Sequence, residues 1–229
     1  IEIWDAQRGI LTYYLLDVDR NRDGQISVYE AQNVLGLDFY NPVTHRPFNV
    51  RSIPEIKYFT ALEHLECVHN QLTSLDLSKN TALAYLSCPG NHLTSLDLSN
   101  NTALYKFRCD DNLLTSLDFS NNTALHEFNC DYNQLTSLDL SNNTALHEFS
   151  CNNNQLTSLD LSNNTALHGF SCNNNQLTSL DLSKNMELEY FTCSGNPLTK
   201  IVLNKNNKIH AKYIQDIMSK YGDIIEYVD

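Results

Sequence analysis

A 21-residue motif dominates this chain, and its clearest copy begins at Asn143 and reads Asn-Thr-Ala-Leu-x-x-Phe-x-Cys-x-x-Asn-x-Leu-Thr-Ser-Leu-Asp-Leu-Ser. The cysteines mark the period, because they fall every 21 residues without an insertion or deletion. A fixed period of this length is typical of solenoid proteins, in which each unit buries its apolar face against its neighbours. We therefore predict a stack of coils marked by Cys67, Cys88, Cys109, Cys130, Cys151, Cys172 and Cys193.

Each copy of the motif carries the same apolar spacing twice. In the copy that begins at Asn143, one half places Phe149 and Cys151 two residues apart, and the other half places Leu159 and Leu161 two residues apart. Alternate residues of a strand point to opposite faces, so these pairs should point inward while the residue between them points outward. The pattern predicts two short strands in each coil, one on each side, with successive coils about 4.8 Å apart.

The doubled pattern resembles the bacterial leucine-rich repeat proteins, specifically the nested variety with a 21-residue unit found in internalin-like cell-surface proteins. The resemblance covers residues 62–209. It implies an α/β-type leucine-rich repeat solenoid made mostly of short parallel β-strands and turns. It also implies a bacterial cell-surface or extracellular protein whose repeats bind a protein or a glycan.

The cysteines are expected to be small core residues rather than disulfides. Neighbours in a parallel, in-register stack have Cβ atoms about 4.8 Å apart, whereas a disulfide needs about 3.8 Å. Their Cα–Cβ bonds also run parallel to one another. We predict that all seven thiols stay reduced and buried, and the alternative of redox or metal chemistry is less favoured.

The regions outside the repeats are expected to cap the stack with helices at both ends. Apolar residues at helical spacing predict a helix before Val18, and residues 37–41 echo the Leu-Asp-Leu-Ser half of the motif as a degenerate half-coil. Caps are needed because a terminal coil otherwise exposes its core. The expected division is 1–36 for an N-terminal helix-loop-helix cap, 37–61 for the half-repeat with a capping loop and helix, 62–209 for seven repeats, and 210–229 for a C-terminal helix-strand cap.

Residues 19–30 match the calcium-binding loop of an EF-hand. Such a loop places oxygen ligands at positions 1, 3 and 5, a glycine at 6, a backbone carbonyl at 7 and a bidentate glutamate at 12. The motif also resembles the calcium segments of dockerins, which need two such segments where this chain has one. We predict a single structural Ca²⁺ site of the kind found in extracellular modules. Its ligands would be Asp19, Asn21, Asp23, Gln25 through its carbonyl, and Glu30.

Charge and hydropathy limit the partners. The net charge of −12 disfavours binding to nucleic acid or to an anionic membrane. No stretch is long and apolar enough to predict a transmembrane segment, and no signal peptide is recognisable, so an export signal would have been removed. The 229 residues are expected to form one folded unit.

The binding residues are expected on the half of the coil that varies between copies. The Thr-Ser-Leu-Asp-Leu-Ser half scarcely changes, whereas the positions beside Phe and Cys differ from coil to coil. An aromatic residue beside two cations would suit an acidic or glycan-bearing partner. The predicted ligand-binding face consists of Tyr85, Lys106, Arg108, Glu127, Glu148 and Tyr190.

Two alternatives remain open at this point. The chain could be a structural spacer or surface-layer element without a specific ligand, in which case its whole circumference should be uniformly polar. Outward columns of aspartates and histidines could hold cations, although local hydrogen bonds for the aspartates and a duplicated surface stripe for the histidines are favoured. No arrangement for nucleophilic, phosphate-transfer or paired-carboxylate catalysis can be placed, so we do not expect an enzyme.

Overall fold

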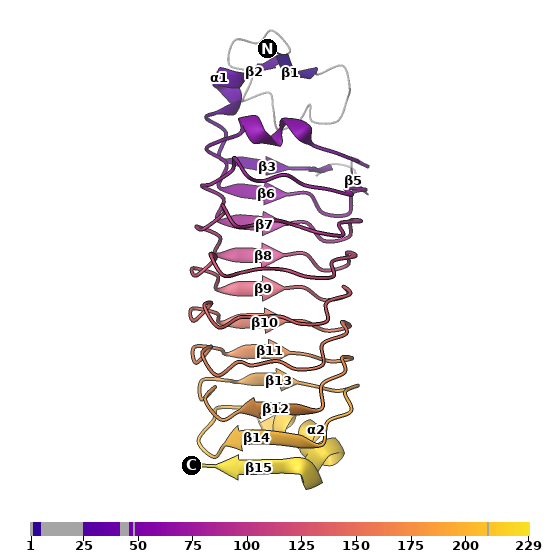
Figure 1. The fold of residues 1–229 in the computed structure, drawn as a ribbon, viewed down its shortest axis with the longest axis vertical. Helices are drawn as coiled ribbons and strands as arrows, with labels where there is room; N and C mark the ends of the chain where they lie inside the picture. The colour runs from indigo at the N-terminus through magenta and orange to yellow at the C-terminus, as the bar shows by residue number, and fades with distance from the viewer. Residues whose placement is uncertain (1, 6–24, 42–45, 48, 210) are drawn as a thin grey trace.

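The computed structural model describes residues 2–5, 25–41, 46–47, 49–209 and 211–229. Within these residues the chain winds into a single stack of coils, with β1 at one end of the long axis and β15 at the other (Figure 1). The repeats between them form the body of the molecule. The predicted solenoid is therefore confirmed.

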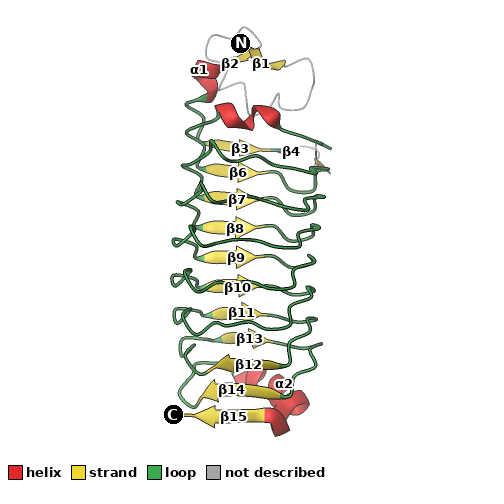
Figure 2. Cartoon of the chain, viewed as in Figure 1, coloured by secondary structure: helices red, strands yellow, loops and turns green. Residues whose placement is uncertain are grey.

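One side of the stack is a parallel sheet of eight strands. Its strand order is β13-β11-β10-β9-β8-β7-β6-β3, and each strand pairs with the equivalent residues of the next coil, so that Phe149 lies beside Phe128 and Phe170. Figure 2 shows these strands as one continuous column. The strands are β3 (Gly36–Asp38), β6 (His64–Glu66), β7 (Tyr85–Ser87), β8 (Lys106–Arg108), β9 (Glu127–Asn129), β10 (Glu148–Ser150), β11 (Gly169–Ser171) and β13 (Tyr190–Thr192).

The opposite side differs from the prediction of a strand in every coil. There, within the part of the chain that the structure describes, a sheet forms only at the C-terminal end, from β12 (Ser179–Leu182), β14 (Lys200–Asn204) and β15 (Ile225–Val228). Aspartate disfavours strands, and most Ser-Leu-Asp-Leu segments have only each other as neighbours. The β-branched residues Ile201 and Val202 favour a strand in β14, and β12 pairs with it.

The core is built from columns of identical side chains. The Phe rings of successive coils stack, with centroids 5.4 Å apart for Phe128 and Phe149 and 5.5 Å apart for Phe149 and Phe170. All seven cysteines are free and buried in the adjacent column, as predicted. Burial raises the pKa of every thiol in the column, to about 12 at Cys67 and at Cys193.

Two columns of asparagine side chains form hydrogen bonds with the backbone at the corners of the coils. In the first, Asn154 donates to the carbonyl oxygens of Cys130 at 2.9 Å and Cys151 at 3.2 Å, and its Oδ1 accepts from the amide of Leu135 at 3.0 Å. In the second column, Asn143 donates to the carbonyl oxygens of Phe119 and Asn122. These amides therefore satisfy backbone groups of the turns.

A left-handed residue follows two positions after each cysteine, a feature that the sequence interpretation missed. The backbone angle φ at this position lies between 52° and 74° throughout the stack. Glycine, asparagine and aspartate tolerate this conformation best, and they occupy most of the column. The residues are His69, Gly90, Asp111, Tyr132, Asn153, Asn174 and Gly195.

The N-terminal end is only partly as predicted. Residues Glu2–Asp5 form strand β1, which pairs with β2 (Gln25–Ser27). The helix expected after Asp5 and before Val18 lies outside the described residues. A short helix α1 (Val28–Ala31) and a 3-10 helix (Pro54–Tyr58) are the helical elements described here, so a helical cap at this end is not shown.

The half-coil that begins the stack lies on the other side from the one predicted. Leu37 in β3 pairs with Leu65 in β6, which places residues 36–38 in the eight-stranded sheet rather than with the Leu-Asp-Leu segments. Phe39 then takes the place of a cysteine, because its amide donates to the carbonyl oxygen of Glu66 at 2.8 Å. Beyond it, β4 (Tyr40–Asn41) pairs with β5 (Arg46–Pro47).

The C-terminal end follows the prediction more closely. The expected helix is α2 (Ala211–Tyr221), and after a 3-10 turn (Gly222–Ile224) the expected terminal strand is β15. Ile217 of α2 is buried against the last coils. Among the described residues, no helix is long and apolar enough to cross a membrane.

Candidate binding face

The outer surface of the eight-stranded sheet is the candidate binding face, which we call the strand face. In each three-residue strand the central residue is buried, while the residues before and after it are exposed or partly buried, except for Ser87 and Gly169, which are buried. The first row of the strand face, taken before the central residue, is His64, Tyr85, Lys106, Glu127, Glu148, Gly169 and Tyr190. The second row is Glu66, Ser87, Arg108, Asn129, Ser150, Ser171 and Thr192.

All six residues of the predicted ligand-binding face therefore lie in these two rows. Tyr85 pairs with Lys106 on adjacent strands, and Arg108 lies two residues further along the same strand. The structure brings them together as the 21-residue spacing predicts. Whether this surface binds a ligand stays a prediction.

The two cations of the face are already paired within the chain. Lys106 forms an ion pair with Glu127, and Arg108 lies 3.4 Å from Asp110. Tyr85 stacks on His64 with ring centroids 4.1 Å apart. These contacts neutralise the positive charges, so the surface offers less to an acidic partner than the sequence alone suggests.

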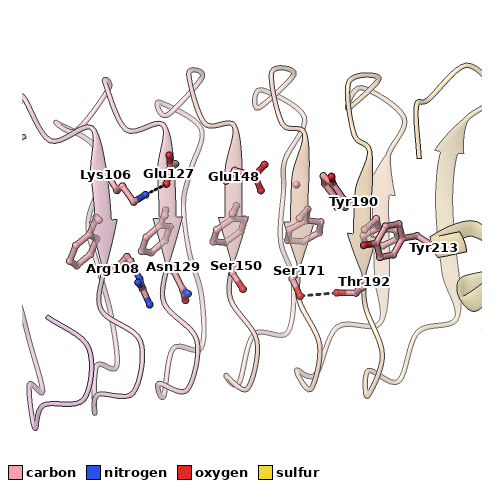
Figure 3. Close-up of a pocket in the computed structure, with 16 residues that line it drawn as sticks. Lys106, Arg108, Glu127, Asn129, Glu148, Ser150, Ser171, Tyr190, Thr192 and Tyr213 are labelled. Atoms are coloured by element: carbon pink, nitrogen blue, oxygen red, sulfur yellow. Dashed lines mark hydrogen bonds and ion pairs between the residues drawn. The ribbon is translucent and has the colours of Figure 1, made fainter. Parts of the chain in front are cut away.

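A shallow hollow of about 440 Å³ extends over the strand face from β8 to β13 (Figure 3). Lys106 and Arg108 lie at one end of it. At the other end Tyr213 of α2 packs edge-on against Tyr190, with ring centroids 5.5 Å apart and planes at 76°. The hollow therefore runs from a basic end, past glutamates, to an aromatic end.

Glu148 is the acidic residue of this hollow that lacks a strong partner. Of the basic side chains in the described part of the chain, only His147 lies within 4.0 Å of its carboxylate, at 3.9 Å. Burial and then the charge of Glu127 raise the pKa of Glu148 above its ordinary value. A cation placed beside this carboxylate would relieve both effects.

Polar side chains along the second row form a hydrogen-bonded network. Ser150 donates to Asp131 at 2.7 Å, and Ser171 donates to Asn152 at 2.7 Å. Ser171 also shares a hydrogen bond with Thr192 at 2.7 Å (Figure 3). This network fixes one wall of the hollow.

The histidine column forms a stack beside the first row. The rings of His126 and His147 have centroids 4.8 Å apart, those of His147 and His168 are 3.7 Å apart, and Tyr105 extends the stack at 4.8 Å from His126. The rings lie nearly parallel, so their nitrogens do not converge on one point. Over the described residues, no group of histidines, cysteines and acids has the arrangement of a metal site.

The aspartate column on the opposite side makes local hydrogen bonds, as favoured from the sequence. Asp139 Oδ1 accepts from the amide of Ser141 at 3.0 Å, and the other aspartates of the column repeat this turn. Hydrogen bonds from Ser141 lower the pKa of Asp139 below its ordinary value. The carboxylates therefore close turns.

The predicted calcium ligands are only partly described. Asp19, Asn21 and Asp23 lie outside the described residues, and Gln25 begins strand β2. Glu30 is buried at the start of α1, where its Oε2 accepts hydrogen bonds from Ser27 N at 3.0 Å and Ser27 Oγ at 2.7 Å. These bonds form a capping box at the helix N-terminus.

The sequence interpretation did not identify Gly169 or Tyr213 as parts of the hollow. The sequence does contain a signal for Gly169, because it is a glycine in a row of larger side chains. It contains no such signal for Tyr213, because this residue comes from a helix outside the repeat and the repeat period does not place that helix.

Comparison with known proteins gives structural matches alone. No family model matches the chain, and no curated protein does. Among solved structures, it is similar to the functional domain of InlJ from Listeria monocytogenes, described as including a cysteine ladder, with 32% sequence identity and a TM-score of 0.59. The match covers 79% of this chain and 46% of that one.

Two further structures share the fold. A leucine-rich repeat protein of Leptospira interrogans is 21% identical with a TM-score of 0.62, over 78% of this chain and 52% of that one. Internalin C2 of Listeria monocytogenes is also 21% identical with a TM-score of 0.62, over 90% of this chain and 85% of that one. This chain thus spans about half the length of the first two. It is an internalin-like leucine-rich repeat solenoid with a 21-residue unit.

Proposed function

We propose that this solenoid binds a protein partner through the strand face at a bacterial cell surface. The observation that carries the proposal is the hollow of about 440 Å³ over β8 to β13, where side-chain identity changes from coil to coil. The similar proteins of known structure come from the bacteria Listeria monocytogenes and Leptospira interrogans. The cell-surface location rests on the likeness to internalins.

Residue type also supports this face as the place of contact. Tyrosine and arginine are enriched among the residues that contribute most to protein interfaces. Tyr190 in β13 is 44% exposed, and just outside the two rows Tyr105 before β8 is 46% exposed and Tyr132 after β9 is 61% exposed. A spacer without a ligand would be uniformly polar around its circumference, so the exposed aromatic side chains favour a binding module.

We further propose that one Ca²⁺ ion stabilises the N-terminal end. The support is the complete ligand pattern Asp19, Asn21, Asp23, Gln25 and Glu30, together with the position of Glu30 at the start of α1. A bidentate glutamate uses both carboxylate oxygens, so coordination by Glu30 would replace the bonds that its Oε2 accepts from Ser27. The bound ion would supply fixed positive charge there and no chemistry.

The test compares the two sides of the solenoid. A partner is captured with the purified chain, and its dissociation constant is measured for a triple variant, Tyr85→Ala with Lys106→Ala and Arg108→Ala. We expect binding to weaken by about 30-fold, which corresponds to about 2 kcal/mol. The matched control, Asp139→Asn with Asp160→Asn on the opposite side, should bind as the natural chain does.

If the Asp139→Asn and Asp160→Asn variant loses binding and the triple variant does not, the binding surface lies on the opposite side of the solenoid from the strand face. Glycan binding is the other arm of the same test. If the captured partner no longer binds after enzymatic deglycosylation, and the triple variant also fails to bind it, then the ligand is the glycan of the partner and not its polypeptide.

A further inference from the structure

We infer that Glu148, Gly169 and Tyr190 form a site for one cationic side chain, a lysine or an arginine, of the protein partner. This inference rests on the proposed function of the strand face and names the chemistry that the C-terminal end of the hollow recognises. Neither the repeat motif nor the likeness to known proteins assigns a role to these residues.

The site depends on a missing side chain. Gly169 pairs with Glu148 on one side and with Tyr190 on the other, so it lies between them in the first row, about 4.8 Å from each strand. Coils 143–163 and 164–184 differ at only two positions, and Glu148 against Gly169 is one of them. The first row therefore lacks a side chain at Gly169, while the rest of this coil, apart from one other position, repeats the one before it.

The carboxylate of Glu148 uses this opening. A Cβ atom at residue 169 would lie 1.9 Å from Glu148 Oε2, which shows that the carboxylate lies over Gly169. Half of the Glu148 side chain remains exposed. The glycine thus lets an acidic group extend along the row toward Tyr190 while it stays accessible from outside.

The charges around the carboxylate include both signs, and the nearest acid dominates. Lys106 is paired with Glu127, whose charge raises the pKa of Glu148 after burial; the charges of His168 and His126 act in the opposite direction, and that of Glu189 raises it again. The chain carries a net charge of −12, so a basic partner would also be attracted at longer range. An ammonium or guanidinium group would supply the missing counter-charge.

The aromatic end suits the same group. Tyr190 and Tyr213 meet at 76°, and Tyr190 shares the hollow with Glu148 (Figure 3). A cation near the face of a tyrosine ring gains about 0.5–1 kcal/mol at an exposed site, and alkyl parts of lysine or arginine pack on such rings. Carboxylate and ring together therefore favour a basic side chain over an apolar or acidic one.

The test uses a probe that does not require the natural partner. The peptide acetyl-Gly-Lys-Gly-amide and its arginine equivalent are titrated into the full chain, and backbone amide shifts are followed by NMR. We expect saturable shifts at Gly169 and Tyr190 that weaken as sodium chloride is raised. The Glu148→Gln variant should weaken binding about threefold or more.

A second variant separates the site from folding. The backbone at Gly169 is not in the left-handed region, so alanine can adopt the same conformation. The added methyl group of Gly169→Ala would displace only the flexible end of the Glu148 side chain. This variant should fold normally, but its affinity for the lysine peptide should be about threefold lower. Glu66→Gln is the matched control, since Glu66 lies in the second row at the far end and already contacts His64.

Three results would overturn the inference. Equal shifts with acetyl-Gly-Leu-Gly-amide would show that charge is not recognised. Unchanged affinity in Glu148→Gln and Gly169→Ala would place the peptide elsewhere. Binding of glucosamine but not of the lysine peptide would assign the cation to an amino sugar. If these results occur while the triple variant still loses its partner, the proposed function stands and only this site is wrong.

Discussion

Asn112 donates a hydrogen bond from its side-chain amide to the carbonyl oxygen of Cys88, one coil earlier, at 3.0 Å. The same amide group also donates to Cys109 in its own coil at 3.1 Å. From Asn91 to Asn196, each corner asparagine of this column thus ties two cysteine carbonyls together, and the bond repeats along the stack. The polar corner and the apolar cysteine column are one structural unit.

Removing one of these asparagines should therefore be costly. Asn154→Ala leaves the buried amide of Leu135 without the side-chain oxygen that accepts from it, and it removes one of the two asparagine donors from each of the carbonyl oxygens of Cys130 and Cys151. An unpaired buried group costs about 1–3 kcal/mol, so we expect the free energy of unfolding in urea to fall by about 2 kcal/mol. The matched control is Asn163→Ala, whose amide makes an exposed bond to Ser141 and should change stability little. Equal effects in the two variants would contradict a structural role for the column.

The thiols should be unreactive in the folded protein. All seven are buried with pKa values well above their ordinary value, and the thiolate is the reactive form. Titration with a thiol reagent should find almost none before unfolding and seven afterwards. A cavity of about 260 Å³ lies beside Cys193 under α2, so this thiol should react first when the C-terminal end loosens. Mass spectrometry of partly labelled protein identifies the site, and early labelling of Cys130 would contradict this order.

Tyr132 should be a source of strain. Its φ of 52° is left-handed, and in the next coil Asn153 has the same conformation with a φ of 54°. An asparagine tolerates this conformation at lower cost, and the Tyr132 side chain is largely exposed, so Tyr132→Asn should raise the free energy of unfolding by about 1 kcal/mol. The reverse change, Asn153→Tyr, should lower it by a similar amount. Loss of stability in Tyr132→Asn would mean that the ring makes contacts that outweigh the strain.

The histidine stack should make stability depend on pH. Burial, followed by the charges of His168 and His126, lowers the pKa of His147 below its ordinary value. The unfolded chain then binds this proton more tightly than the folded chain, so stability falls as pH decreases through about 6.5. We expect a lower urea midpoint at about pH 5.5 than at about pH 7.5, and a smaller difference in His147→Gln. His92→Gln, an exposed position outside the stack, should keep the full difference.

Calcium should raise the melting temperature of the N-terminal end. At a Ca²⁺ concentration of 100 times the dissociation constant, binding adds about 2.7 kcal/mol to the part that unfolds with the site. A chelator should remove this gain. Glu30→Gln keeps an oxygen that can accept from Ser27 at the helix cap, so it should lose the calcium effect while the cap persists. Identical melting curves of the natural chain in calcium and in chelator would exclude the site.

Much of the fold followed from the spacing of the repeat. The period placed Cys151 and Phe149 in inward columns, and the same spacing of 21 residues accounts for the pairing of Lys106 with Glu127, which could have been foreseen. The lack of strands along most of the opposite side could not be foreseen, because a Leu-Asp-Leu pattern alternates like a strand whether or not its neighbours can pair. Strand formation there depended on Ile201 and Val202 at one end of the stack.

The candidate site was predictable only in part, for a related reason. Tyr85, Lys106 and Arg108 share a surface because they share the repeat. Tyr213 reaches the hollow because α2 folds back on β13, a tertiary contact that periodicity does not encode. The position of the Glu148 carboxylate over Gly169 likewise depends on how one side chain lies in three dimensions.

The in-register stack also has a consequence for how such a gene can change. Coils 143–163 and 164–184 are nearly identical, and the hydrogen bonds of Asn154 and Asn175 stay within their own coil and the preceding one. Unequal recombination between the two DNA segments would add or remove one whole coil, and the cysteine and asparagine columns would close across the junction. The distance between the two ends would change by about 4.8 Å at each event. The length of the solenoid can thus change between generations while every coil keeps the same packing and hydrogen bonds.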